Sequence, residues 1–185
     1  MCNYMTGAKY MSAADAVKLV KSYDKVYIQG STSIPEVLCQ ALADCHEELR
    51  GVEVYSAFGV ARGVAPYSVP EYRDSFIVKS LFIANSVRDS IARGEGQCIP
   101  GFLGEIPEFF RQGLIPLDVV FLNVSLPDKD GYCSYGVSAD LTVSAVECAK
   151  VVIAQVNKQM PYSYGDALIH ISKLDACVEV DEPLV

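Results

Sequence analysis

The sequence predicts an α/β domain: a mainly parallel sheet with helices on both faces. Short apolar runs, most clearly 119–124, are typical of strands that are buried on both faces. Segments with helical spacing of apolar residues lie between these runs, and strands that alternate with helices favour parallel pairing. At 185 residues the chain suits one domain with a sizeable core.

The first predicted helix opens at Ser12, whose hydroxyl can cap free N–H groups. A strand at 26–28 follows, and Ser33 with Glu36 predicts a capping box at the start of the next helix. Pro35 is expected early in that helix, where its missing N–H costs nothing. Later helices are expected at 87–93, 105–112 and 141–149, and later strands at 52–56, 76–84, 97–99, 118–124, 151–156, 168–171 and 176–180.

The loops that follow parallel strands gather at one edge of the sheet. Here they are the loops richest in glycine and polar residues, at 29–33, 57–62, 85–86, 125–138 and 157–165. We therefore expect any ligand site to lie at this edge.

Two of these loops hold the first candidate site residues. Gln29, Gly30 and Ser31 come between a strand and a helix N-terminus, where unpaired N–H groups favour a carboxylate or an oxyanion. A tight turn with a helix cap is the structural alternative for the same residues, and the residues alone favour it. Tyr132 and Ser134, in the long loop after 118–124, are candidates for lining a pocket.

A third candidate is the M-P-Y-S-Y-G segment at 160–165, which predicts a rigid aromatic loop. Met160, Tyr162, Tyr164 and Gly165 could wall a small pocket. They could equally pack against the edge of the sheet.

The residues do not supply a complete set of nucleophile, base and orienting group. Cys133 could act as a nucleophile, but neither His46 nor His170 has a clear claim to be its base. The chain has no G-x-S-x-G elbow, no Walker loop and no metal-spaced His/Cys cluster. We therefore assign no catalytic residue and no metal ligand within it.

Charge and composition exclude several classes of protein. The formal net charge of −8 argues against a nucleic-acid partner, because phosphate binding needs a basic surface. Seven cysteines at irregular spacings, without a C-x-x-C pair, indicate reduced thiols. The N-terminus has no apolar signal region, and no apolar run reaches the roughly 20 residues of a membrane span. We expect a cytoplasmic protein with no membrane partner.

Two loop motifs identify a family resemblance. They are S-x-P-D-x-x-G-Y-C-S-x-G-V-S-x-D at 125–140 and V-N-K-Q-M-P-Y-S-Y-G at 156–165, supported by L-G-E-I-P-E-F-F at 103–110. Together they strongly resemble the acetyl-CoA hydrolase/transferase family, and within it the 4-hydroxybutyrate and butyrate–acetate CoA-transferases.

The resemblance implies that residues 1–185 are an N-terminal CoA-transferase domain. Family members have two related α/β domains with the active site between them. A glutamate of the second domain attacks the acyl-CoA thioester, and the exchange proceeds through a glutamyl-CoA thioester. That glutamate and the glycine-rich CoA loop would lie beyond Val185, so the isolated chain is expected to be inactive. Glu105 matches a family position that we interpret as structural.

The resemblance also implies the ligands and partners. Acyl-CoA and a small carboxylic acid are the expected substrates of the full enzyme, and no cofactor is expected to bind this domain alone. The chain's own C-terminal domain is the expected partner, in a homo-oligomer when full length. An acyl-CoA hydrolase of the same family and a non-catalytic domain that binds a small carboxylate are the alternatives.

Overall fold

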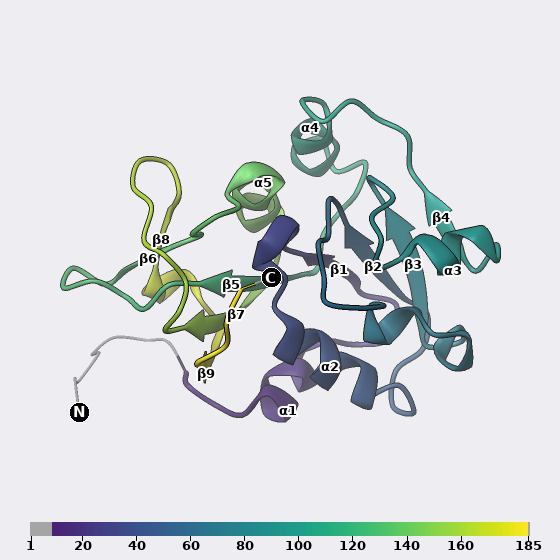
Figure 1. The fold of residues 1–185 in the computed structure, drawn as a ribbon, viewed down its shortest axis with the longest axis horizontal. Helices are drawn as coiled ribbons and strands as arrows, with labels where there is room; N and C mark the ends of the chain where they lie inside the picture. Colours follow the sequence, from purple (N-terminus) through teal and green to yellow (C-terminus); the bar gives the residue numbers. More distant parts are fainter. Residues whose placement is uncertain (1–8, 185) are drawn as a thin grey trace.

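The computed structural model describes residues 9–184, and its main element is a seven-stranded sheet in which every neighbouring pair is parallel (Figure 1). The strands lie in the order β4-β3-β2-β1-β5-β7-β9. Their bounds are β1 (Lys25–Ile28), β2 (Val52–Ser56), β3 (Phe76–Ser80), β4 (Gly96–Cys98), β5 (Val119–Val124), β7 (Val151–Asn157) and β9 (Ala176–Val180). The predicted fold class is confirmed.

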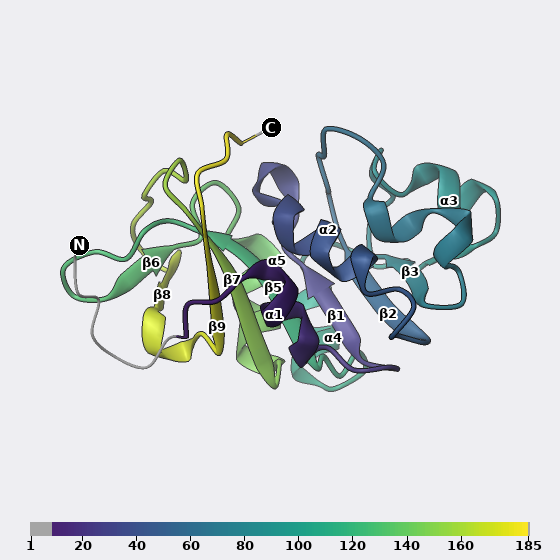
Figure 2. The ribbon, with the colours of Figure 1, turned by 90° about the horizontal axis from the view of Figure 1, so that it is seen from below.

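Five α-helices accompany this sheet in the described part of the chain. Helices α1 and α2 pack on one face, and α4 and α5 pack on the other (Figures 1 and 2). Their bounds are α1 (Ala13–Ala16), α2 (Glu36–Asp44), α3 (Arg88–Ala92), α4 (Ile106–Arg111) and α5 (Asp140–Cys148). Short 3₁₀ turns are η1 (Val17–Leu19), η2 (Ser31–Ser33), η3 (Pro66–Ser68), η4 (Pro70–Tyr72) and η5 (Ile171–Lys173).

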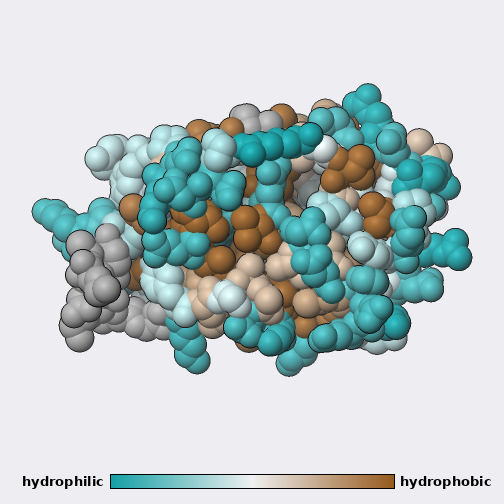
Figure 3. Space-filling model, turned by 60° about the horizontal axis from the view of Figure 1, so that its bottom comes forward, coloured by the Kyte–Doolittle hydropathy of each residue, from teal (hydrophilic) through white to brown (hydrophobic). Residues whose placement is uncertain are grey.

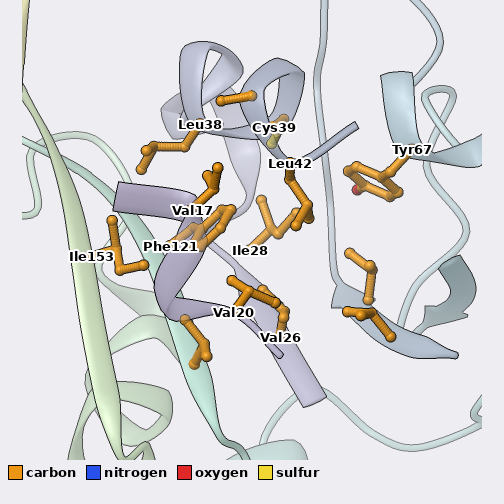
Figure 4. Close-up of a cluster of buried hydrophobic side chains, with 14 of the residues drawn as sticks. Val17, Val20, Val26, Ile28, Leu38, Cys39, Leu42, Tyr67, Phe121 and Ile153 are labelled. Carbon is orange, nitrogen blue, oxygen red and sulfur yellow. The ribbon is translucent and has the colours of Figure 1, made fainter. Parts of the chain in front are cut away.

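Each face of the sheet has its own hydrophobic core, because side chains alternate along a strand. On β1, Ile28 faces the core beneath α1 and α2, whereas Tyr27 faces the core beneath α4 and α5. Figure 4 shows Leu38 and Leu42 of α2 above Ile28 and Phe121. The apolar strands predicted to be buried on both faces are therefore covered on both.

The direction in which the chain winds reverses at the centre of the sheet. From β1 the chain moves outward through β2 and β3 to β4, and from β5 it moves outward the other way through β7 to β9. Strands β1 and β5 are neighbours, with Val26 opposite Val119. Loops that leave two such strands for opposite faces open a crevice at their carboxyl ends.

Several local expectations were wrong. The capping box of Ser33 and Glu36 does not form, because Ser33 belongs to a separate turn, η2, and Glu36 is the first helical residue. Pro35 is the N-cap residue rather than part of the helix. The strand expected at 76–84 ends at Ser80.

The long loop after β5 also contains structure that the sequence did not predict. Its strand β6 (Tyr132–Ser134) pairs antiparallel with β8 (Leu168–His170) as a small second sheet. The pairing places His170 beside Tyr132, with ring centroids 5.0 Å apart. This small sheet carries the loop motif 125–140 away from the central strands.

Candidate ligand cleft at the centre of the sheet

A cavity of about 300 Å³ lies at the carboxyl ends of the central strands. It is enclosed by β5, β7, the loop after β1, the start of α2 and the chain after β9. Figures 1 and 2 both place the C-terminal end of the chain beside η2 and the start of α2. The lining residues are Thr32, Ile34, Glu36, Val37, Gln40, Asn123, Gln155, Asn157, Glu182, Pro183 and Leu184.

Two amide side chains on adjacent strands form part of its wall. Asn123 of β5 and Gln155 of β7 are directly opposite in the parallel register, and each is at most 2% exposed. The Gln155 Oε1 accepts a hydrogen bond from the N–H of Val37 at 3.2 Å. The Asn123 Oδ1 is buried without a hydrogen-bond partner among the described residues. Buried polar atoms are nearly always paired, so this oxygen is an exception in the wall of the cavity.

The rim of the cavity is acidic and is held in place by the chain after β9. Glu36 and Glu182 line the cavity, and the Glu36 carboxylate accepts the N–H of Arg62 at 3.3 Å. Asn157 donates to the Glu182 carbonyl at 2.8 Å and accepts the Glu182 N–H at 3.1 Å. The Arg62 guanidinium donates to the carbonyl of Pro183. These bonds fasten residues 182–183 across the mouth of the cleft.

A second cavity, of about 210 Å³, lies on the other side of the start of α2. It shares Ile34, Glu36 and Gln40 with the first cavity and extends beneath the loop 61–67. On the face shown in Figure 3, apolar side chains lie among polar ones.

Among the predicted site residues, Gln29 is fully buried and its amide is occupied by the backbone. Its Nε2 donates to the carbonyls of Tyr135 and Ser138, at 3.2 and 2.8 Å, and its Oε1 accepts the N–H of Asn123 at 2.7 Å. These bonds fix the end of β1 to the end of β5 and to the segment before α5. Gln29 thus positions the loops around the crevice.

Gly30 and Ser31 form a strained junction with the loop after β2. A Cβ on Gly30 would collide with the carbonyl oxygen of Ala57. Ser31 and Phe58 both have positive φ, +56° and +52°, which costs free energy in residues other than glycine. Ser31 donates its N–H to the Phe58 carbonyl and accepts the N–H of Val60, both at 3.0 Å. Such strain is typical of functional loops.

Ser134 and Met160 connect the two loop motifs. The Ser134 Oγ donates to the Ser163 carbonyl at 2.9 Å and accepts the N–H groups of Ser163 and Gly136, each at 3.0 Å. Met160 is buried against Gly136, where an added Cβ would collide with the Met160 sulfur. The structure therefore brings 132–136 and 160–163 together, as a site made from both motifs requires.

The three predicted site tyrosines and Gly165 lie closer to the molecular surface than Ser134 and Met160. Tyr162 donates to the Asp128 carboxylate at 2.8 Å, and its ring lies 5.1 Å from that of Tyr164. Burial, and then this hydrogen bond, raise the pKa of Tyr162 to about 12. Tyr164 is 82% exposed, Tyr132 is 42% exposed, and Gly165 ends the loop with φ +80°.

The chemistry of the remaining candidates is limited. Burial raises the pKa of the Cys133 thiol to about 12, so it is protonated at neutral pH and a poor nucleophile. Within residues 9–184, no group of three or more His, Cys, Asp or Glu side chains is placed to hold a metal ion. Every helix in the same range is too short or too polar to cross a membrane.

None of the nine predicted site residues lines the cavity at the central strands. Asn123 and Gln155, which do, were missed. Their signal was one polar residue inside each of two apolar strands, at 119–124 and 151–157. The sequence does not show which residues of the two strands are opposite each other. Without this strand register, such residues cannot be distinguished from polar groups that pair within the sheet.

A parallel sheet that winds outward in both directions from its central strands, with helices on both faces, defines a doubly wound α/β domain. Residues 4–185 match the acetyl-CoA hydrolase/transferase N-terminal domain family, and the chain belongs to that family.

Curated relatives and solved structures agree with this assignment. The chain is 37% identical over 96% of its length to the 4-hydroxybutyrate coenzyme A transferase of Clostridium kluyveri, and 29% identical over 96% to the butyryl-CoA:acetate CoA-transferase of Anaerostipes caccae. It superimposes on 4-hydroxybutyrate CoA-transferase from Porphyromonas gingivalis with a TM-score of 0.77 and 38% identity, covering 96% of this chain and 40% of that one. It superimposes on RipA from Yersinia pestis with a TM-score of 0.87 and 27% identity, covering 96% of this chain and 43% of that one.

The chain therefore spans about two fifths of the length of these relatives, since it covers 41% of the Clostridium enzyme and 40% of the Anaerostipes enzyme. The homologues are CoA-transferases.

Proposed function

We propose that this chain is the N-terminal half of an acyl-CoA:carboxylate CoA-transferase of the 4-hydroxybutyrate or butyrate–acetate type. The observation that carries the proposal is the match to the Clostridium enzyme, 37% identical over nearly the whole of this chain but over 41% of that protein. The substrates proposed for the complete enzyme are an acyl-CoA and a small carboxylic acid.

The proposed reaction is a ping-pong exchange through a glutamate outside these 185 residues. Its carboxylate attacks the acyl-CoA thioester, which releases the CoA thiolate and leaves a mixed anhydride. The thiolate then attacks the glutamyl carbonyl, which releases the acyl group as a carboxylate and leaves a glutamyl-CoA thioester. An acceptor carboxylate reverses both steps, so that acceptor acyl-CoA forms and the glutamate is regenerated.

In this proposal, the present chain supplies one wall of the active site. Gln29 fixes the ends of β1 and β5, and the strained pair Ser31 and Phe58 gives the wall a rigid shape. Phe58 stacks on Phe82, with ring centroids 4.4 Å apart, and Phe82 is 53% exposed. Rigid, partly apolar loops of this kind suit the acyl part of a substrate, while the other half of the protein closes the site.

The test is acyl-CoA to acetate exchange, measured on the 185-residue chain and on the longer protein that an uninterrupted gene would encode. We expect exchange in the longer protein alone. Turnover by the short chain would contradict the proposal and make Glu105 the first glutamate to test. Thiol release without transfer to acetate would identify a hydrolase. The absence of acyl exchange and of thiol release in both proteins would favour a non-catalytic carboxylate-binding domain.

A further inference from the structure

The cleft at the central strands has two unused hydrogen-bond donors in its wall. Asn123 and Gln155 are opposite residues on β5 and β7, on the face of the sheet that carries Phe121 and Ile153 beneath α2. Each lines the cavity and is at most 2% exposed. Among the described residues, Asn123 Nδ2 and Gln155 Nε2 have no hydrogen-bond partner, and unlike Asn123 Oδ1 neither nitrogen is sealed from solvent.

The surroundings of each amide fix which of its atoms faces the cavity. Gln155 Oε1 accepts the N–H of Val37 at 3.2 Å, so this oxygen points toward α2 and the nitrogen of the same amide points elsewhere. In Asn123 the oxygen is the atom enclosed by protein. Turning that amide over would enclose an unpaired N–H, which folded proteins tolerate less well than an unpaired oxygen. The pair therefore presents two donors and no acceptor to the cavity.

The spacing of the two strands lets both donors share one oxygen. Adjacent strands lie roughly 4.8 Å apart. An oxygen about 2.9 Å from each of two nitrogens can bridge a gap of up to about 5.8 Å. A carbonyl oxygen has two lone pairs, so it can accept one hydrogen bond from each amide. Asn123 and Gln155 are thus arranged to hold a single carbonyl oxygen.

The charges around the cleft favour a neutral ligand. Glu36 and Glu182 line it, and its described lining includes no lysine or arginine. The nearby Arg62 guanidinium is bound to the carbonyl of Pro183. A carboxylate would be repelled by the two glutamates, since no lining cation offsets their charge. An ammonium group carries only donors and would leave both amide nitrogens unpaired, whereas a neutral carbonyl avoids both costs.

The remaining walls of the cleft suit an alkyl group. Their apolar side chains are those of Ile34, Val37, Pro183 and Leu184. We propose that this cleft binds a small neutral carbonyl compound, with its oxygen between Asn123 Nδ2 and Gln155 Nε2 and its alkyl part against these apolar side chains. Two sources share this chemistry: an acyl thioester, and a free ketone or ester. Only the first source rests on the proposed function.

The direct test is a titration of the ¹⁵N-labelled chain, followed through the side-chain amide signals of Asn123 and Gln155. The probes are heptan-4-one, S-ethyl thiobutyrate, butyrate and butylammonium. We expect the two neutral carbonyl compounds to shift both signals in a saturable way, and the two ions to leave them unchanged. Butyrate binding as tightly as the ketone would overturn the proposal. A shift confined to one of the two amides, or no saturable shift with either neutral probe, would overturn it as well.

Two substitutions and a matched control sharpen the test. Gln155→Glu keeps an acceptor for Val37 but replaces the donor, and Asn123→Leu removes both the donor and the enclosed oxygen at similar volume. Each is expected to weaken ketone binding about tenfold, measured through the remaining amide signal. Because Asn123→Leu removes an unpaired buried oxygen, its melting temperature should not fall. Val64→Ala, at a residue that lines the second cavity and not the first, should bind like the parent chain. Unchanged affinity in both cleft variants would refute the assignment.

The two neutral probes identify the source, because heptan-4-one is S-ethyl thiobutyrate with its sulfur replaced by a methylene. Thioester binding at least tenfold tighter than ketone binding would assign the cleft to an acyl thioester, and any smaller preference would assign it to a free ketone or ester. Neither measurement depends on turnover. A protein that fails the exchange assay but binds both carbonyl probes would refute the proposed function and leave the carbonyl site standing. The converse result would refute the carbonyl site alone.

Discussion

Gly30 lies so close to Ala57 that a single added Cβ would collide with the Ala57 carbonyl oxygen. This contact joins the ends of β1 and β2, and the Ser31–Phe58 hydrogen bond follows it directly along the chain. The backbone on both sides is already strained, with positive φ at Ser31 and Phe58. A residue larger than glycine therefore cannot be accommodated at this junction unless the backbone shifts.

Gly30→Ala is accordingly expected to lower the free energy of unfolding by about 3 kcal/mol, the upper part of the usual range for overpacking. Denaturant unfolding measures the change. Gly104→Ala is the matched control, because no atom lies within 4 Å of the position its Cβ would take. A loss in the control as large as that in Gly30→Ala would show that the close contact is not the cause.

The hydrogen bond between Tyr162 and Asp128 should be visible in the titration of the tyrosine. Burial and the neighbouring carboxylate raise the pKa of Tyr162 to about 12. In Asp128→Asn we expect that pKa to move toward the ordinary tyrosine value of about 10. Phenolate absorbance against pH measures it, with Tyr162→Phe identifying the signal. An unmoved titration in Asp128→Asn would show that the carboxylate does not contribute.

The hydrogen bonds to the Asp128 carboxylate should also make the free energy of unfolding depend on pH in the acid range. The N–H of Tyr132, and then the Tyr162 hydroxyl, hold the pKa of Asp128 below its usual value. A carboxyl whose pKa is lower in the folded state stabilises the fold while it is ionised. Its contribution is thus present above about pH 4, the unfolded pKa, and is lost as pH falls through the lower folded value. The stability difference between the parent chain and Asp128→Asn should shrink over this acid range and stay constant near neutrality.

Much of the sheet could be predicted because local pattern and tertiary role agree. Apart from Asn123, the run at 119–124 is apolar on both faces of β5, and the structure covers both faces with helices. The start of α2 could not be predicted, since the cap depends on where the chain turns. Ser33 and Glu36 have the spacing of a capping box, yet Ser33 lies in the preceding turn.

The cleft depends on information that the sequence does not display. Asn123 and Gln155 are 32 positions apart, and only the pairing of β5 with β7 places them side by side. The predicted loops do meet where Ser134 binds Ser163, because both motifs follow central strands. Tyr164 is 82% exposed and contacts the ring of Tyr162, and this contact does not define a role for it from this chain alone.

Thiol reactivity should separate the exposed cysteine from the buried ones. Cys98 is exposed on the edge strand β4, whereas Cys133 is fully buried with a pKa raised to about 12. Iodoacetamide should therefore modify Cys98 in the folded chain and reach Cys133 only after unfolding. Peptide mass mapping over time distinguishes the two. Rapid modification of Cys133 in the native chain would contradict its burial and reopen its candidacy as a nucleophile.

The core beneath α2 is expected to depend most on Phe121. Its ring is fully buried on β5, between Ile28 of β1 and Ile153 of β7 (Figure 4). Phe121→Ala would leave a cavity at the central strands, and such truncations cost about 3–5 kcal/mol. Phe102→Ala, at a side chain that is 79% exposed, should change stability by less than about 0.5 kcal/mol. Equal effects of the two substitutions in denaturant unfolding would show that the central core is not organised around β5.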